Sequence, residues 1–336
     1  MNINVHGKQI MGIQVIRGIS ALLILLYHYT SRYNDIDYVT PHANWPVNIP
    51  WGCYAVSTFF LISGFLTASD LVKGTSPVMF IKKRVNRLYP TFWAALIITY
   101  FVTLFFHQGN VRFLDLLVNF SMIPAVFGFE PVDGVYWTLQ YELFFYVVIS
   151  ILLLIKNRKL IIASLVSWLL LSVVFYFLQN DINIHISKVI RVFGIIDYAA
   201  AFILGLAMGL FRHKYISNYL YVTIILISFV SFFLYKGAQS IFFAANYLLL
   251  QYVISNENCI LNKDNIITKP FAWIAALSYP LYLIHQKIGY IIISNTIALT
   301  GYNGIATILL PFIVSLLIAY CLHRYVEINK SIKILN

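Results

Sequence analysis

Arg17 and His28 are the first residues that suggest chemistry, because both lie inside the apolar stretch 10–30. A charged side chain near the middle of a membrane span costs about 2.5–3.5 kcal/mol, so such residues usually face the protein interior. The offset of eleven residues is about three helical turns, which places both side chains on one face, roughly 16 Å apart. This spacing favours a common polar cavity. The alternative is that Arg17 reaches the lipid headgroups and His28 marks the membrane interface.

Two further titratable residues lie in other apolar stretches. Glu142 lies in the stretch 135–155, and His285 lies in the stretch 271–291. A lone carboxylate at such a depth must be paired or protonated. An imidazole, with an ordinary pKa of about 6.5, is suited to proton transfer at neutral pH. We expect His28, Glu142 and His285 to meet at one depth and form a site; a structural hydrogen-bond network is the alternative.

Three arginines predict an anion site at the other end of these helices. Arg84 and Arg87 are three residues apart, which places them on one face of a helix. Arg17 is expected at the same membrane face. The planar guanidinium group suits phosphate better than an ammonium group does. The alternative is that Arg84 and Arg87 only set the membrane topology.

The composition indicates what kind of protein must position these residues. Hydrophobic residues make up 60% of the 336-residue chain and charged residues only 10%, whereas soluble domains carry roughly 25% charged residues. Despite a net charge of +11, these values exclude a soluble globule, a disordered chain and a nucleic-acid reader. The three cysteines are far apart and match neither a disulfide framework nor a zinc site. The sequence predicts an all-α polytopic membrane protein without a metal site.

Ten apolar stretches are long enough to cross a membrane as helices. They are 10–30, 51–72, 88–107, 135–155, 160–178, 189–211, 219–235, 238–254, 271–291 and 304–324. A further stretch, 111–127, is interrupted by Asp115, Asn119 and Pro124, and we expect a re-entrant or interfacial helix there. Within 189–211, Asp197 is expected to pair with Arg191 or with a helix end.

Lysine and arginine positions predict the orientation. The basic clusters within 73–87 and 156–159 belong on the cytoplasmic side by the positive-inside rule. This choice leaves 111–127 outside and places both termini in the cytoplasm. No linker or shift in composition divides the chain, so residues 1–336 are expected to form one integral membrane domain.

Six segments follow one another along almost the whole chain. They are RGISALLILLYH (17–28), STFFLISGF (57–65), FIKKRVNRLYP (80–90), VYWTLQYELFFY (135–146), LSYPLYLIH (277–285) and YVEINK (325–330). In this order they resemble the membrane-bound acyltransferase 3 family, whose bacterial members O-acylate cell-surface carbohydrates. The family's ten spans agree with the count above. Some members carry an additional soluble esterase-like domain after the membrane part, and none is expected in this chain.

The resemblance implies acetyl-CoA as the acyl donor, used as a substrate rather than as a permanently bound cofactor. Cytoplasmic Arg17, Arg84 and Arg87 would then hold the CoA phosphates. The acceptor would be a bacterial surface carbohydrate such as O-antigen or exopolysaccharide, free or lipid-linked, at the outer face of the bacterial inner membrane. The alternatives are acylation of a small molecule or lipid, and a non-enzymatic transporter or flippase.

The resemblance also suggests roles in catalysis. His28 is expected to act as the general base on the acceptor hydroxyl, and a covalent acyl-His28 intermediate remains an open variant. Glu142 and His285 complete the expected catalytic group, with Glu142 orienting an imidazole or the acceptor. The remaining predicted substrate contacts are Trp137, Ser278 and Tyr282.

Overall fold

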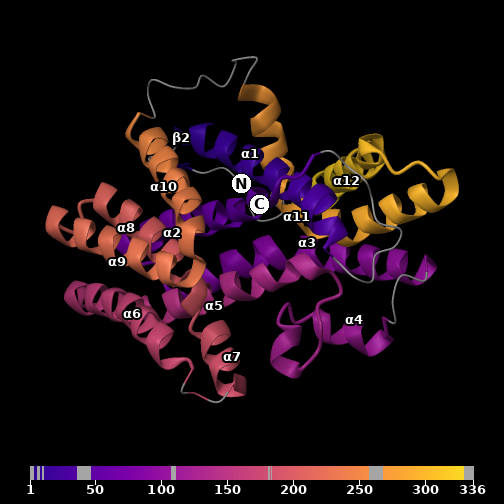
Figure 1. Cartoon of the computed structure of the whole chain (residues 1–336). Coiled ribbons are helices and arrows are strands. Elements are labelled where there is room, and N and C mark those ends of the chain that lie inside the picture. Colours follow the sequence, from indigo (N-terminus) through magenta and orange to yellow (C-terminus); the bar gives the residue numbers. More distant parts are fainter. Residues whose placement is uncertain are drawn as a thin grey trace.

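The computed structural model describes residues 4–5, 8–9, 11–35, 47–106, 111–180, 182, 184–256 and 268–328, which form an almost entirely helical molecule (Figure 1). The α-helices are α1 (Met11–Tyr27), α2 (Ala55–Lys73), α3 (Pro77–Phe105), α4 (Phe113–Asn119), α5 (Trp137–Leu152), α6 (Arg158–Leu178), α7 (Ile184–Phe193), α8 (Ala199–Arg212), α9 (Asn218–Lys236), α10 (Ser240–Ser255), α11 (Thr268–Thr300) and α12 (Leu309–Leu322). A π-helical turn, η1 (His28–Arg32), continues α1, and the short strands β1 (Asn4–Val5) and β2 (Lys8–Gln9) pair antiparallel. The predicted all-α class is confirmed.

Seven stretches of the described chain are long and apolar enough to cross a membrane. They are Met11–Arg32, Pro50–Lys73, Pro77–Phe105, Gly134–Leu152, Arg158–Leu178, Asn218–Ser255 and Ile305–Ile328. Their exposed side chains include Leu171, Leu226 and Leu317, as contact with lipid requires. The chain is therefore a polytopic membrane protein. The short helix α4 is not among the seven, in agreement with the expectation for 111–127.

The seven stretches contain eight of the ten predicted spans. Asn218–Ser255 holds both α9 and α10, which Gly237 separates with a φ of +57°. The two remaining spans are 189–211, where α8 is short, and 271–291, where α11 is continuous but the polar residues 285–287 lower its hydropathy. The cytoplasmic placement of both termini was predicted partly from Lys330 and Lys333, which lie outside the described residues.

The predicted single helix over 189–211 is wrong. The chain breaks after α7, where Ile195 has a φ of +55°, and α8 begins at Ala199. Arg191 and Asp197 form an ion pair across this break, with N–O distances of 2.9 Å. Six residues along a straight helix would place these side chains about 120° apart around the helix axis. The predicted pairing of Asp197 with Arg191 is confirmed, and it needs the break.

Helix α8 packs against α2 with almost no side chain between the two backbones. A Cβ atom at Gly205 would lie 1.9 Å from the carbonyl oxygen of Leu61, and one at Gly64 would lie 2.1 Å from that of Phe202. Small residues at such crossings let membrane helices approach closely, which supplies the packing that holds them together. The short helix α8 is thus buried at the centre of the bundle, and its residues 199–210 are all buried.

We expect Gly205→Ala to lower the free energy of unfolding by about 1–3 kcal/mol, because the added methyl group meets backbone that cannot move aside. Gly134→Ala is the matched control, since its Cβ would meet only the end of the Gln286 side chain, at 3.0 Å. Thermal unfolding of the two purified variants in detergent measures the difference. Equal midpoints would contradict the tight crossing.

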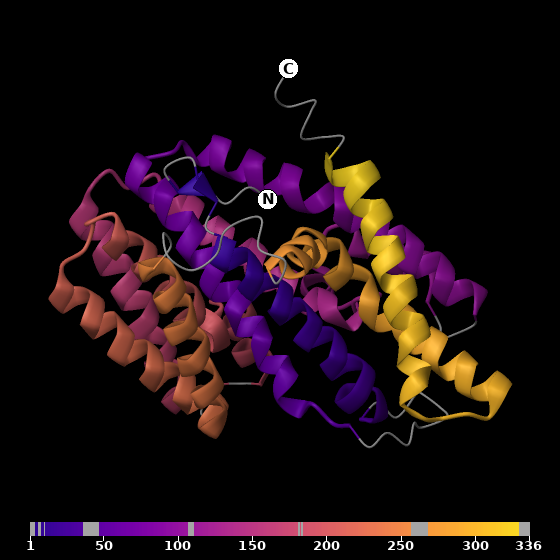
Figure 2. The ribbon, with the colours of Figure 1, turned by 90° about the horizontal axis from the view of Figure 1, so that it is seen from above.

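Helices α1 and α11 run side by side in the same direction. Gly18 lies against the backbone of Phe271 near the start of α11, and Tyr29 lies against Gly289 further along it. Figure 2 shows α1 between α2 on one side and α11 with α12 on the other. This parallel pair carries Arg17 and His28 on one helix and Ser278 and His285 on the other, so it forms the framework of the candidate site.

Candidate functional site

The two histidines lie in hydrogen-bond contact. His28 Nδ1 and His285 Nε2 are 3.0 Å apart. His285 Nδ1 faces the carbonyl oxygens of Tyr282 at 2.9 Å and Leu281 at 3.1 Å. A carbonyl oxygen only accepts, so Nδ1 of His285 carries a proton and Nε2 of the neutral ring accepts. The proton of the hydrogen bond between the two rings is then on His28 Nδ1, which also lies 2.9 Å from the carbonyl oxygen of Ile24.

This arrangement leaves Nε2 of neutral His28 with a free lone pair. His285 is 1% exposed, whereas His28 is only partly buried and lines a cavity of about 700 Å³. We call it the His28 cavity; it is lined by residues of α1, η1, α2, α5, α9 and α11, among them Trp137, Tyr282 and Gln286. His28 is therefore held in one tautomer by His285 and presents a base to an open space.

A second, smaller cavity lies around Arg17. It measures about 80 Å³ and is named here the arginine cavity; its polar lining residues are Arg17, Ser63, Arg87, Thr138, Glu142, Ser278, Tyr279 and Tyr282. Arg17 is 6% exposed, and its Nη2 donates to Ser278 Oγ at 2.8 Å. The predicted anion site thus brings Arg17 and Arg87 together, and Ser278 lies on the side of the arginines.

The two cavities meet at Tyr282. Its side chain and that of Val56 line both of them. The Tyr282 hydroxyl lies 2.8 Å from Thr138 Oγ1 and donates to the carbonyl oxygen of Val135 at 3.1 Å. Tyr282 is therefore fixed by the start of α5 at the boundary between the His28 and arginine cavities.

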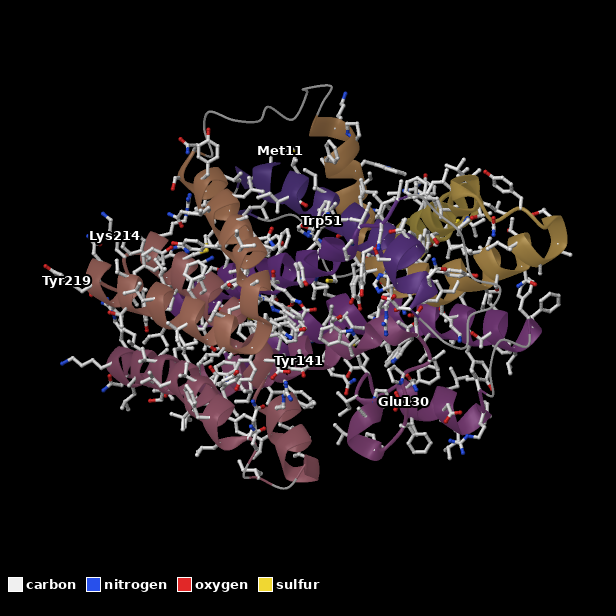
Figure 3. All side chains as sticks on the ribbon, in the orientation of Figure 1. Met11, Trp51, Glu130, Tyr141, Lys214 and Tyr219 are labelled. Carbon is white, nitrogen blue, oxygen red and sulfur yellow. The ribbon has the colours of Figure 1, made fainter. Side chains whose placement is uncertain are left out.

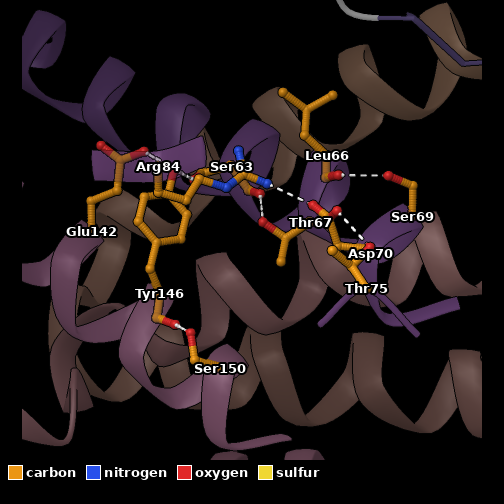
Figure 4. A network of polar contacts seen from close by, with 10 residues as sticks. All are labelled: Ser63, Leu66, Thr67, Ser69, Asp70, Thr75, Arg84, Glu142, Tyr146 and Ser150. Atoms are coloured by element: carbon orange, nitrogen blue, oxygen red, sulfur yellow. Dashed lines mark hydrogen bonds and ion pairs between the residues drawn. The ribbon is translucent and has the colours of Figure 1, made fainter. Parts of the chain in front are cut away.

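Glu142 lies on the arginine cavity and not on the His28 cavity. Its Oε1 accepts from Tyr146 at 2.5 Å and from Ser63 at 3.1 Å (Figure 4). The sequence suggested that Glu142 orients an imidazole or the acceptor, but within the described residues His285 is the side chain that forms a hydrogen bond with His28. The carboxylate instead holds two hydroxyl groups in the wall beside the arginines.

Arg84 lines neither cavity. Its Nη2 pairs with Asp70 Oδ2 at 3.0 Å, and its guanidinium lies over the rings of Phe80 and Tyr146, 4.9 Å from each centroid. Figure 4 shows this pair beside Thr75, whose hydroxyl also donates to Asp70. The structure thus separates Arg84 from Arg17 and Arg87, and its contact with a donor stays a prediction.

Asp133 is a buried residue that the sequence reasoning missed. It is 0% exposed; its Oδ1 accepts from the backbone N–H of Val135 at 3.2 Å and its Oδ2 from that of Lys287 at 3.0 Å. It ties the loop before α5 to α11 beside a third cavity of about 520 Å³, which shares Trp137 and Gln286 with the His28 cavity. Glu130 of the same loop lies below the centre in Figure 3 and also lines this cavity. The signal was an Asp directly before a helical segment, the preferred N-cap type.

Burial raises the pKa of the Asp133 carboxyl group to about 6, from an ordinary value of 3.8, against the two backbone N–H groups, which lower it. A raised pKa means that the folded state holds this proton more tightly than the unfolded state does. The stability gained from this proton is present below pH 3.8 and is lost as the pH rises through about 6. The difference between these two pKa values corresponds to about 3 kcal/mol of folding free energy.

Because the Asp133 carboxyl group loses this proton, we expect the thermal unfolding midpoint in detergent to decrease as the pH rises from 3.8 to about 6. Asp133→Asn, a neutral residue of similar shape, should remove that part of the slope. An unchanged pH dependence in the variant would assign the slope to other groups.

Comparison with known proteins gives the family context of this geometry. A family model described as an acyltransferase domain, type 3, matches residues 10–324. A putative acetyltransferase, ORF330, of Acidianus two-tailed virus is 23% identical over 150 residues, which cover 44% of this chain and 42% of that protein. Nodulation protein 10 of Rhizobium leguminosarum bv. viciae is 28% identical over 156 residues, covering 38% of this chain and 42% of that protein. The chain thus spans less than half the length of these curated relatives, and no solved structure matches it.

Proposed function

Because the chain belongs to the membrane-bound acyltransferase 3 family, we propose that it is an O-acetyltransferase, which moves an acetyl group from acetyl-CoA to a hydroxyl group of a cell-surface carbohydrate. In this proposal the donor arrives from the cytoplasm and the acceptor from the outer face of a bacterial inner membrane. The relative described as an acetyltransferase supports the choice of acetyl as the transferred group.

The observation that carries the proposal is the pair of cavities that meet at Tyr282. One holds the buried cation Arg17 with Arg87, and the other holds the base His28. A transfer reaction between two separate substrates needs two binding spaces that share one reacting point. Arginine groups suit the phosphates of CoA, and an imidazole lone pair suits an attacking hydroxyl.

The proposed reaction begins when Nε2 of His28 takes the proton of the acceptor hydroxyl. The oxygen attacks the thioester carbonyl carbon, the new C–O bond forms, and the C–S bond breaks. The proton then passes from His28 to the leaving CoA thiolate, which restores the neutral imidazole. Throughout, Nδ1–H of His28 donates to His285 Nε2 and the Ile24 carbonyl oxygen, and both acceptors stabilise the transient imidazolium.

On the donor side, Arg17 and Arg87 would bind phosphate oxygens in this scheme. Ser278 holds the Arg17 guanidinium through its 2.8 Å hydrogen bond. Glu142 positions Ser63 and Tyr146 in the same wall, so its part is indirect. Trp137 and Tyr282 line the His28 cavity, where the acceptor would lie.

Mass spectrometry of surface glycan tests the proposal. Cells that express the chain should carry a mass increment of one acetyl group on a glycan repeat, and cells without the gene should not. Feeding isotopically labelled acetate should shift that increment, which identifies the transferred group. An increment of another acyl mass would contradict the donor, and identical glycans in both strains would contradict the acceptor.

A further inference from the structure

The His28 cavity contains a cation that makes no direct ion pair with a carboxylate of the described residues. Lys236 is the last residue of α9, and it lines this cavity together with Arg32. Its Nζ lies 3.3 Å from the Tyr198 hydroxyl and 4.5 Å from the centroid of that ring. Among the described residues, no carboxylate oxygen lies within 4.0 Å of this ammonium group. A partly buried cation without a counter-ion is unfavourable in a membrane protein.

The carboxylate nearest in sequence to the Tyr198 contact is already engaged. Asp197 accepts from Nε and Nη2 of Arg191, both at 2.9 Å. A bidentate pair of this kind uses both oxygens of the carboxylate. Asp197 therefore holds the break between α7 and α8 through Arg191 and acts on Lys236 only at longer range, without an ion pair.

Arg32 adds a second cation to the same cavity. It follows His28 by four residues, which places the two side chains on neighbouring positions of one helical face. Asp35 is the acidic residue among those that line the cavity, so the lining as a whole is positive. Both cations thus line the same cavity as His28.

The position of Lys236 at a helix end does not account for its side-chain direction. A lysine in the last turn of a helix interacts favourably with the helix dipole, and lysines near membrane interfaces extend toward water. Here the ammonium group instead lies against Tyr198 in the cavity wall, where it makes no ion pair with a carboxylate of the described residues. An anionic ligand in the cavity would supply the missing charge.

We propose, on the basis of the function proposed above, that the acceptor carries an acidic group, a carboxylate or a phosphate, which binds between Lys236 and Arg32. The acid lies close to the hydroxyl that meets His28, because Arg32 is one helical turn from that residue. Such an oxyanion has two sources: an acidic sugar of the glycan, or the phosphate of a lipid carrier that holds the glycan.

The first experiment locates the acetyl group on glycan purified from cells that express the chain, by NMR and mass spectrometry. Acetyl on an acidic sugar or its direct neighbour, once per repeat, identifies the sugar as the source of the charge. Acetyl on the first sugar next to the carrier phosphate, once per chain, identifies the carrier. Acetyl on a neutral sugar remote from any acid overturns the inference and leaves the proposed function standing.

The second experiment measures the same acetylation in cells with variant chains of equal membrane abundance. Lys236→Met and Lys236→Glu should lower acetylation at least tenfold, whereas Lys236→Arg, which keeps the charge, should retain most of it. The control is Lys214→Met: Lys214 is exposed at the left edge of Figure 3, near Tyr219 at the opposite end of α9. CoA binding by calorimetry should stay unchanged in all four variants, which shows that they are folded.

Wild-type acetylation in Lys236→Met would overturn the inference, because a charge contact cannot survive loss of the charge. Equal losses in Lys236→Met and Lys236→Arg would also overturn it, since they would show a requirement for lysine shape alone. Absence of acetyl on any glycan in the wild-type strain would contradict the proposed function itself, which is a different result from either of these.

Discussion

His28→Ala is expected to reduce acetyl transfer by about 10²–10⁴-fold, the usual contribution of a general base. The loss should fall on kcat, because Nε2 of His28 acts on the hydroxyl proton and the arginine cavity is separate from it. The assay uses the full chain in lipid vesicles with labelled acetyl-CoA and the purified surface glycan. CoA binding should remain at the wild-type level.

A second variant, His285→Gln, tests whether His285 fixes the tautomer of His28. His285→Gln removes the acceptor that fixes the His28 tautomer, so part of the His28 population carries its proton on Nε2. We expect a smaller loss than in His28→Ala, about tenfold to a hundredfold, since the base itself remains. Near-normal transfer by folded His28→Ala protein would exclude His28 as the base. If the labelled acetyl group stays bound to the wild-type protein in the absence of acceptor, this would instead indicate a covalent acyl-His28 intermediate.

Arg17→Gln should raise the KM for acetyl-CoA by about 10- to 100-fold, because hydrogen bonds to a charged group are worth about 1.5–3 kcal/mol. The guanidinium is 6% exposed and held by Ser278, so little else can replace it in the arginine cavity. The effect on kcat should be smaller, since the contact is the same before and during the transfer step.

Arg84→Gln is the matched control for this prediction. It also removes a guanidinium, but one that pairs with Asp70 and lines neither cavity. We expect an unchanged KM for acetyl-CoA together with a lower thermal midpoint, because the carboxylate of Asp70 loses its partner. Equal KM increases in both variants would show that the donor contacts both arginines.

Much of the fold could be predicted because the bilayer restricts the choices. Lipid offers no hydrogen-bond partner to the backbone, so long apolar stretches in a chain with 10% charged residues must become helices. The helix period also predicted that Arg17 and His28 share a face, and both do contact the same neighbour, α11. These are local properties, which the spacing of residues along one helix determines.

The break at 194–198 could not be read from hydropathy. The stretch 189–211 is apolar enough for one helix, but α8 packs closely on α2 through Gly64 and Gly205, and the Arg191–Asp197 pair turns the chain before it. The ion pair is local, but the close packing of α8 depends on α2, a distant segment of the chain. Only the packed structure therefore decides where the helix begins.

The tertiary structure likewise decided how the candidate residues are divided between the His28 cavity and the arginine cavity. The sequence assigned Arg84 and Arg87 the same predicted role in donor binding and grouped Glu142 with the histidines. Residue type and depth carry no information about which side chains are neighbours. Arg84 forms an ion pair with Asp70, and Glu142 accepts hydrogen bonds from Ser63 and Tyr146 beside the arginine cavity. The sequence by itself indicated which polar side chains lie in the apolar stretches. The packing of α1, α2, α5 and α11 decided which of them meet, because a hydrogen bond requires a few ångströms that only neighbouring helices provide.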